Sequence, residues 1–229
     1  MPDHRDVEPL TGLPGTAGVP PVHSAGPEWR SRRYLPHYDR PALVQMITFR
    51  LVDSLPATAL SQLASLAVED PRRRTRLEVL LDSDGGRCFL GDPRVARIVE
   101  SALWHFDDRR YHLLAWVIMP NHVHVLIETV AGHPLASVVG RWKSFTAKRA
   151  NSLLHRTGAF WWPDYFDRAI RDERHLERSI EYIHSNPVKA GLAEYPAQWP
   201  FSSASSGRPS PGTGRRPAVP DGVSTPRLG

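Results

Sequence analysis

Short apolar runs alternate along the chain with longer stretches in which apolar residues recur every three or four positions. Residues 42–51, 110–119 and 122–128 are rich in β-branched and aromatic side chains without a breaker, which predicts three strands. The run at 110–119 is apolar on both faces, so we expect a central strand there. A short aromatic segment within 160–170 predicts a fourth strand.

The helical stretches carry start and stop signals. Asp92 followed by Pro93 predicts the first turn of a helix that leads up to the second strand. Residues 133–154 form the clearest amphipathic helix, and Asp172 is expected to cap a last helix that Pro187 and Gly191 end. The predicted apolar stripe of the helix at 133–154 comprises Leu135, Val138, Val139, Trp142 and Phe145.

The order of these elements predicts the fold class. Apart from additional helical stretches at 58–70 and 73–82, the order is β-α-β-β-α-β-α. This order is typical of the ferredoxin-like α+β fold (βαββαβ), an antiparallel sheet with helices packed on one face. The final helix is an addition to that plan, and it carries Tyr182.

Composition sets the size of the folded region. Residues 1–33 and 205–229 are rich in Pro, Gly, Ser and Arg without apolar periodicity, which predicts disordered tails around a single domain at 34–204. The 41% of apolar residues is enough for a core, and the net charge of +5 favours an anionic partner, nucleic acid first.

Compartment is predicted from cysteine use and from hydrophobic length. The single cysteine, Cys88, permits no internal disulfide, which fits a reducing environment. The longest apolar run is too short to cross a bilayer, and the N-terminal residues lack the basic and apolar regions of a signal peptide. We therefore expect a cytoplasmic protein without membrane contact.

Two histidines stand out in the strand at 122–128. Side chains alternate across a strand, so His122 and His124 share one face while the intervening valines share the other. Neutral imidazoles bind divalent metals well, and a pair on one strand supplies half of a metal site. The alternative is a pair of solvated or hydrogen-bonded histidines on an exposed sheet face, and the pair alone does not decide between them.

The last helix offers partners for the histidines. Tyr182 and Asn186 are one helical turn apart, on the flank of an apolar stripe. An amide oxygen at this spacing can join two histidines around a hard metal ion, with the phenol beside it. The alternative is that Tyr182 packs at the edge of the stripe and Asn186 caps the helix before Pro187.

Together these segments resemble the HUH single-tyrosine transposases, most closely the REP-associated tyrosine transposases. The resemblance covers about residues 34–204. It depends on "MPNHVHVLIE" at 119–128, on "GRWKSFTAKRAN" at 140–151, and on "WWPDYFDRAIRDERHLERSIEYIHSNPVKAGL" at 161–192. The combination of a His-hydrophobic-His strand with a helix bearing Tyr-x-x-x-Asn before Pro-Val-Lys-Ala-Gly is specific.

This resemblance implies a metal-dependent enzyme that cleaves and rejoins single-stranded DNA, at hairpins of the REP type, through a 5′-phosphotyrosine. His122, His124 and Asn186 match the metal-binding positions, with Mg²⁺ or Mn²⁺ as the implied ion, and Tyr182 matches the nucleophile. It also implies a cytoplasmic protein associated with the nucleoid. The monomeric or homodimeric state stays open.

Several basic residues are candidates for DNA contacts because cations neutralise phosphates. Those on the helix at 133–154 lie on or beside its polar side, and the others flank the expected site. The candidates are Arg141, Lys143, Lys148, Arg149, Arg168 and Lys189.

Two other functions remain open on the sequence. One is a nucleic-acid-binding regulator on the same fold that does not cleave. The other is a replication initiator or relaxase that shares the histidine pair, although such proteins usually carry further domains or a second nearby tyrosine.

Overall fold

A computed structural model describes residues 29–31, 36–38, 42–56, 58–59, 72, 76, 79–80 and 85–205. Their strands are β1 (Trp29–Ser31), β2 (Pro36–Tyr38), β3 (Val44–Arg50), β4 (Tyr111–Ile118), β5 (His122–Thr129) and β6 (Phe166–Ala169). The helices are α3 (Pro93–Trp104), α4 (Leu135–Leu153) and α5 (Glu173–Lys189), with short 3₁₀ turns at Phe89–Gly91 and Pro196–Gln198.

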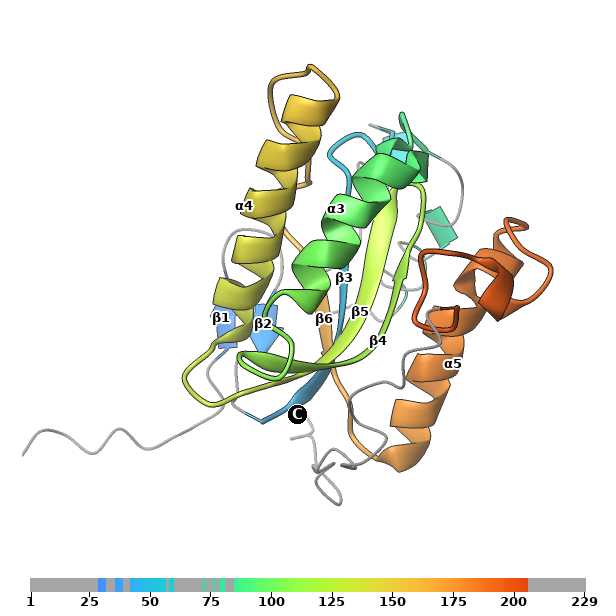
Figure 1. Cartoon of the computed structure of the whole chain (residues 1–229). Coiled ribbons are helices and arrows are strands. Elements are labelled where there is room, and N and C mark those ends of the chain that lie inside the picture. Colours follow the sequence, from blue (N-terminus) through green and yellow to red (C-terminus); the bar gives the residue numbers. More distant parts are fainter. Residues whose placement is uncertain are drawn as a thin grey trace, which may run out of the picture.

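Strands β3 to β6 form one antiparallel sheet in the order β4-β5-β3-β6. The α+β ferredoxin-like prediction is confirmed, because α3 and α4 cover one face of this sheet (Figure 1). Helix α5 lies against the opposite face and contacts β4 and β5 (Figure 1). The sheet is therefore a middle layer between the α3–α4 pair and α5.

Alternation along β5 divides the core into two parts. Val123, Val125 and Ile127 are fully buried and pack in the cluster beneath α3 and α4. The other face of the sheet carries a smaller apolar cluster that includes Leu126 and Ile183 of α5. The histidine positions of β5 belong to this second face, since they alternate with the valines.

Helix ends follow the predicted capping chemistry, with one correction. The Asp92 and Asp172 carboxylates accept hydrogen bonds from the backbone N–H groups of Arg94 and His175, at 2.9 and 2.7 Å. Pro187 does not end the last helix, because α5 continues through it to Lys189, whereas Gly191, with a φ of 70°, follows the helix end as predicted. Proline removes one backbone donor, but the helical bonding resumes with the Ala190 N–H donating to the Asn186 carbonyl at 3.0 Å.

Two predictions on the main elements also need correction. Phe145 was placed on the buried stripe of α4, yet its side chain is 51% exposed. Thr146 takes the inward position and accepts the indole N–H of Trp161 at 2.9 Å. Strand β4 is an edge strand rather than a central one. Its apolar pattern is explained by helices on both faces and by residues 201–203, which hydrogen-bond to its free edge.

The N-terminal segment departs in part from the predicted tail at 1–33. Strand β1 falls within it and pairs antiparallel with β2, which lies next to β6. The rest of that segment, most of the predicted helices at 58–70 and 73–82, and the C-terminal segment from 206 onwards lie outside the described residues. Among the described helices, none is long and apolar enough to cross a membrane.

Candidate active site

Strand β5 brings the two predicted histidines together on the α5 side of the sheet. In the sheet register, His122 lies opposite Arg50 and His124 opposite Thr48. Both imidazoles are 1% exposed and hydrogen-bonded, so they do not lie solvated on an exposed sheet face. Their Nε2 atoms are 3.0 Å apart, which directs one nitrogen of each ring to the same point.

The other nitrogen of each ring has an oxygen partner. The Asn121 amide donates to the Gly85 carbonyl at 3.3 Å, which leaves its Oδ1 as an acceptor for the Nδ1–H of His122 at 2.6 Å. This bond sets the His122 tautomer, so its Nε2 presents a lone pair. The Nδ1 of His124 is 2.7 Å from the Thr48 hydroxyl. Such outer partners orient the imidazoles that bind metals.

Burial also keeps the first imidazole neutral. It lowers the pKa of His122 to about 3, because a charged ring loses solvation inside the sheet–helix interface. A neutral imidazole is the form that binds a metal ion. His122 is thus ready to bind a cation over the physiological range without first losing a proton.

Helix α5 contributes a polar stripe that faces the sheet. His175, Ser179, Tyr182 and Asn186 are spaced at i, i+4, i+7 and i+11, which places them on one side of the helix. The Tyr182 ring lies 5.3 Å from the His124 ring, measured between centroids, at an interplanar angle of 74°. The ammonium of Lys189 lies 4.9 Å from the centroid of the same phenol ring.

Asn186 is the third candidate ligand, and its surroundings fit that role. Its side chain is 1% exposed, and neither amide atom has a hydrogen-bond partner among the described residues. A buried amide without partners is costly, and a cation would satisfy the oxygen. The alternative that Asn186 caps the helix is wrong, because the residue lies inside α5.

The donor set limits what kind of metal site is possible. Among the described residues, no group of three or more His, Cys, Asp or Glu side chains is arranged to hold a metal ion. Within the part of the chain that the structure describes, a site built on His122 and His124 would be completed by an amide, water or substrate oxygen. Two imidazole nitrogens with an amide oxygen suit Mg²⁺ or Mn²⁺ when phosphate oxygens are added, and they also suit softer divalent ions.

The predicted DNA-binding residues are divided between the two faces of the sheet. Arg168, on β6, and Lys189 lie on the α5 side, near Tyr182. Arg141, Lys148 and Arg149 are exposed on α4, which covers the opposite face (Figure 1). The structure therefore does not bring these three residues to the histidine pair.

Lys143 has a different environment from the other basic candidates. Its ammonium donates to the backbone carbonyls of Trp162, Pro163 and Asp164, at 2.6, 2.9 and 3.0 Å. Burial lowers its pKa to about 8. All three N–H donors already hold the loop before β6, so we assign Lys143 to the support of this loop.

The fold brings further residues to the site that were not predicted from the sequence. Thr48 and Asn121 bond the histidine rings, and Arg50 is buried at the end of β3, opposite His122, with its guanidinium 4.2 Å from the Trp162 ring. Nothing in the sequence of β3 indicates its register against β5. By contrast, the i, i+4, i+7, i+11 spacing that includes His175 is visible in the sequence.

Comparison with known proteins supports the predicted resemblance. A profile of the family described as "Transposase IS200 like" matches residues 92–186. A REP-associated tyrosine transposase of Escherichia coli K12 is 31% identical over 98 residues, which are 42% of this chain and 56% of that protein. A relative from Haemophilus influenzae is 27% identical over 103 residues, which are 41% of this chain and 58% of that relative. The matches thus span little more than half of these relatives.

One solved structure supports the fold. It is a REP-associated tyrosine transposase bound to a REP hairpin, with a TM-score of 0.50 and 19% sequence identity. The superposition covers 76% of this chain and 81% of that chain. At this identity the likeness concerns the arrangement of strands and helices. The resemblance to REP-associated tyrosine transposases that the sequence motifs predicted is confirmed by these matches together.

Proposed function

Because a profile of the family described as "Transposase IS200 like" matches residues 92–186, we propose that the protein cleaves and rejoins single-stranded DNA with Tyr182 as its nucleophile. The observation that carries this proposal is the 5.3 Å separation of the His124 and Tyr182 rings within one chain. A histidine pair on a strand and a tyrosine on a distant helix meet here without a contribution from a second subunit.

The chain's own residues supply a nucleophile and its surroundings. The Tyr182 oxygen attacks the scissile phosphorus, forming an O–P bond, while the bond from phosphorus to the 3′ oxygen breaks. The phenol loses its proton and the departing 3′ oxygen gains one, so the proton count is unchanged. The products are a 5′-phosphotyrosine and a 3′-hydroxyl. Because the phosphodiester energy is retained, a 3′-hydroxyl of another end can reverse the attack and join strands without ATP.

The residues that would hold a divalent ion are His122, His124 and Asn186. When bound, Mg²⁺ or Mn²⁺ supplies Lewis acidity that polarises the scissile phosphate and stabilises charge on its oxygens. Asn121 and Thr48 keep the two imidazoles oriented through their Nδ1 atoms. The Lys189 ammonium, over the phenol ring, is placed to offset negative charge during attack.

The proposed substrate is single-stranded DNA that carries a REP-type hairpin. The family match and the relative whose structure contains a REP hairpin support this choice. Arg168 lies on the Tyr182 side and is proposed to contact the strand being cut. Arg141, Lys148 and Arg149 are proposed to contact another part of the hairpin, because they project from the opposite layer of the molecule.

A covalent-adduct assay tests the proposed activity. The protein is incubated with Mn²⁺ and a hairpin-bearing single-stranded oligonucleotide labelled at its 3′ end, and the products are separated in SDS. We expect a protein–DNA adduct in wild type, and none in Tyr182→Phe or in the presence of EDTA. An adduct that persists in Tyr182→Phe would show that another residue is the nucleophile.

The second candidate function is a nucleic-acid-binding regulator that does not cleave. The exposed basic residues of α4 lie away from the histidine pair, which favours nucleic-acid binding that does not depend on cleavage. The same assay separates the two functions. Equal hairpin affinity in wild type and Tyr182→Phe, with no adduct in either, supports the regulator.

A further inference from the structure

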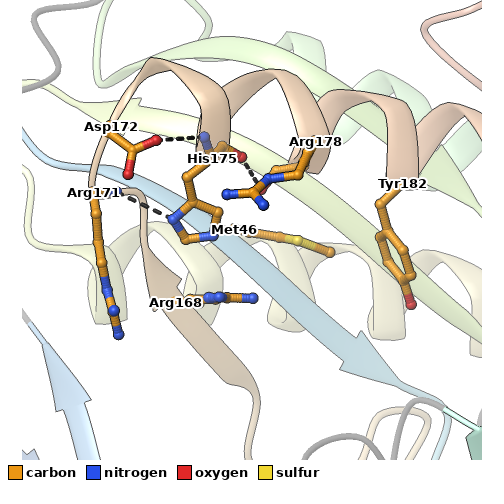
Figure 2. A pocket seen from close by; sticks show the side chains of 8 residues that line it. Met46, Arg168, Arg171, Asp172, His175, Arg178 and Tyr182 are labelled. Carbon is orange, nitrogen blue, oxygen red and sulfur yellow. Dashed lines mark hydrogen bonds between the residues drawn. The ribbon is translucent and has the colours of Figure 1, made fainter.

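A basic groove lies beside Tyr182, along the N-terminal half of α5. It has a volume of about 390 Å³, its floor includes Met46 of β3, and Tyr182 lines one end. Arg168, Arg171 and Arg178 line it from β6, from the loop after β6 and from α5 (Figure 2). Helix α5 contacts β4 and β5, and the groove lies between its N-terminal half and strands β3 and β6.

The charge of the groove is positive. Three guanidinium groups face one carboxylate, that of Asp172, which accepts the His175 backbone N–H at 2.7 Å as the helix cap. The Nε–H of Arg178 donates to the Arg174 carbonyl at 3.2 Å. The guanidinium group of Arg178 points toward His175 (Figure 2). Guanidinium groups in this arrangement match the oxygens of a phosphate.

His175 provides the observation that points to a ligand. The ring is 6% exposed and lines the groove. Its Nδ1 accepts the Arg171 backbone N–H at 3.3 Å, so in the neutral ring Nε2 carries the hydrogen. Burial, and then Arg168, lower its pKa to about 4, which keeps it neutral. The Nε2 atom is buried and has no hydrogen-bond partner among the described residues, so a donor faces the groove without an acceptor.

The stereochemistry of attack indicates which part of the strand reaches this groove. In-line displacement puts the leaving 3′ oxygen opposite the Tyr182 oxygen, so the upstream strand leads away from Tyr182. The downstream strand stays attached through the 5′-phosphate, on the side of Tyr182. His175 precedes Tyr182 by seven residues, about 10 Å along the helix axis, so a neighbouring phosphate rather than the scissile one would lie there.

We propose that the groove formed by Arg168, Arg171, Arg178 and His175 binds a backbone phosphate of the DNA strand 3′ of the cleavage point. This inference rests on the proposed cleavage by Tyr182 and adds a subsite that holds the covalently attached strand. The His175 Nε2–H and the arginines donate to the non-bridging oxygens of that phosphate. Retention of this strand keeps the phosphotyrosine positioned for the rejoining step.

The test combines the neutralisation of one phosphate with the substitution of one side chain and measures DNA affinity. Affinity is measured for Tyr182→Phe, which leaves the strand uncut, with oligonucleotides that carry one neutral methylphosphonate at successive positions. We expect one position 3′ of the cleavage point to weaken binding about tenfold, the effect of losing charge-assisted hydrogen bonds. Arg178→Gln in the same background should weaken binding to the unmodified strand by a similar factor. When the strand carries the methylphosphonate at that one position, Arg178→Gln should cause no additional loss.

A matched control is available on the same helix. Arg174 is exposed on α5 but does not line the groove, so Arg174→Gln should show independent, additive losses at every methylphosphonate position. His175→Gln, which keeps a donor but shifts it, should couple to the same position as Arg178→Gln. Arg178→Gln should also reduce the slope of log affinity against log salt by about 0.7, the value for one phosphate on a single strand.

The outcomes separate this inference from the proposed cleavage. The subsite is overturned if Arg178→Gln gives additive losses at every position. It is also overturned if Arg178→Gln couples only to a position 5′ of the cleavage point or to a terminal phosphate, even where wild type forms its adduct. Coupling at a 3′ position supports the subsite, including in a protein that binds the strand but forms no adduct. Absence of any binding to the strand overturns both.

Discussion

Replacing Asn186 by leucine separates the stability cost of its buried amide from its proposed role as a metal ligand. Leucine has the same number of side-chain heavy atoms and the same branching, but its methyl groups are larger than the amide oxygen and nitrogen, so tighter packing inside the sheet–α5 interface offsets part of the gain in stability. The substitution removes one acceptor and one donor group that have no partners among the described residues. It also places a residue of higher helix propensity within α5.

The size of the effect follows from the cost of unpaired polar groups. An unsatisfied buried donor or acceptor costs about 1–3 kcal/mol, so without metal we expect Asn186→Leu to raise the free energy of unfolding by roughly 2–4 kcal/mol. With Mn²⁺ the difference in free energy of unfolding between the variant and wild type should become smaller. Wild type gains about 2.7 kcal/mol at a metal concentration one hundred times the dissociation constant, whereas the variant should gain much less.

Urea unfolding in EDTA and in Mn²⁺ measures both effects. Asn151 provides the matched control, because it also lies in a helix but its amide donates to the Gly158 carbonyl and accepts from Arg156, both at 2.9 Å. Asn151→Leu should destabilise the protein equally with and without metal. A loss of stability for Asn186→Leu in EDTA would refute the cost assigned to its unpaired amide, and a Mn²⁺ gain equal to that of wild type would refute the assignment of Asn186 as a ligand.

Three further outcomes are expected. Thr48→Val removes the hydroxyl beside His124 Nδ1 and should weaken Mn²⁺ binding about 10- to 100-fold in calorimetry, with little change in fold stability; unchanged affinity would show that Thr48 does not orient the ring. Lys143→Met leaves three carbonyls without donors and should cost about 3 kcal/mol in urea unfolding, whereas hairpin affinity in the folded protein should change little. His175 has a folded pKa of about 4, below its unfolded value, so the unfolded chain binds the extra proton and stability falls as pH drops from about 6.5 to 4. That loss is about 3 kcal/mol, and a pH series in which His175→Gln falls as steeply as wild type would contradict it.

The sequence predicted the elements of the sheet and the faces of β5 because both follow from local periodicity. The opposition of His122 and His124 to the valines depends only on alternation, and the structure confirms that division. The edge position of β4 could not be predicted this way. The apolar pattern of β4 indicates that both of its faces are buried, but it does not indicate which strands pair with it. The segment that covers its edge is also far away in sequence.

Part of the site was equally out of reach. The partners of the histidine rings depend on the register of β3 against β5, which no local pattern records. The continuation of α5 through Pro187 was missed because tertiary packing of Ile183 and Asn186 outweighs a local helix breaker. Lys143 showed the same limit, since a lysine beside the polar side of a helix is expected to be solvated, but the fold brings three carbonyls to it.

The pairing of residues 201–203 with β4 has a consequence for how molecules meet. The Ile118 N–H donates to the Phe201 carbonyl at 2.8 Å, and the Ser203 N–H donates to the Trp116 carbonyl at 2.9 Å. These bonds occupy backbone groups to which a strand of another molecule would otherwise add. A chain shortened before Phe201 should expose these backbone groups and become prone to strand-to-strand aggregation. Residues 201–203 therefore protect the β4 edge of the sheet from pairing with another molecule.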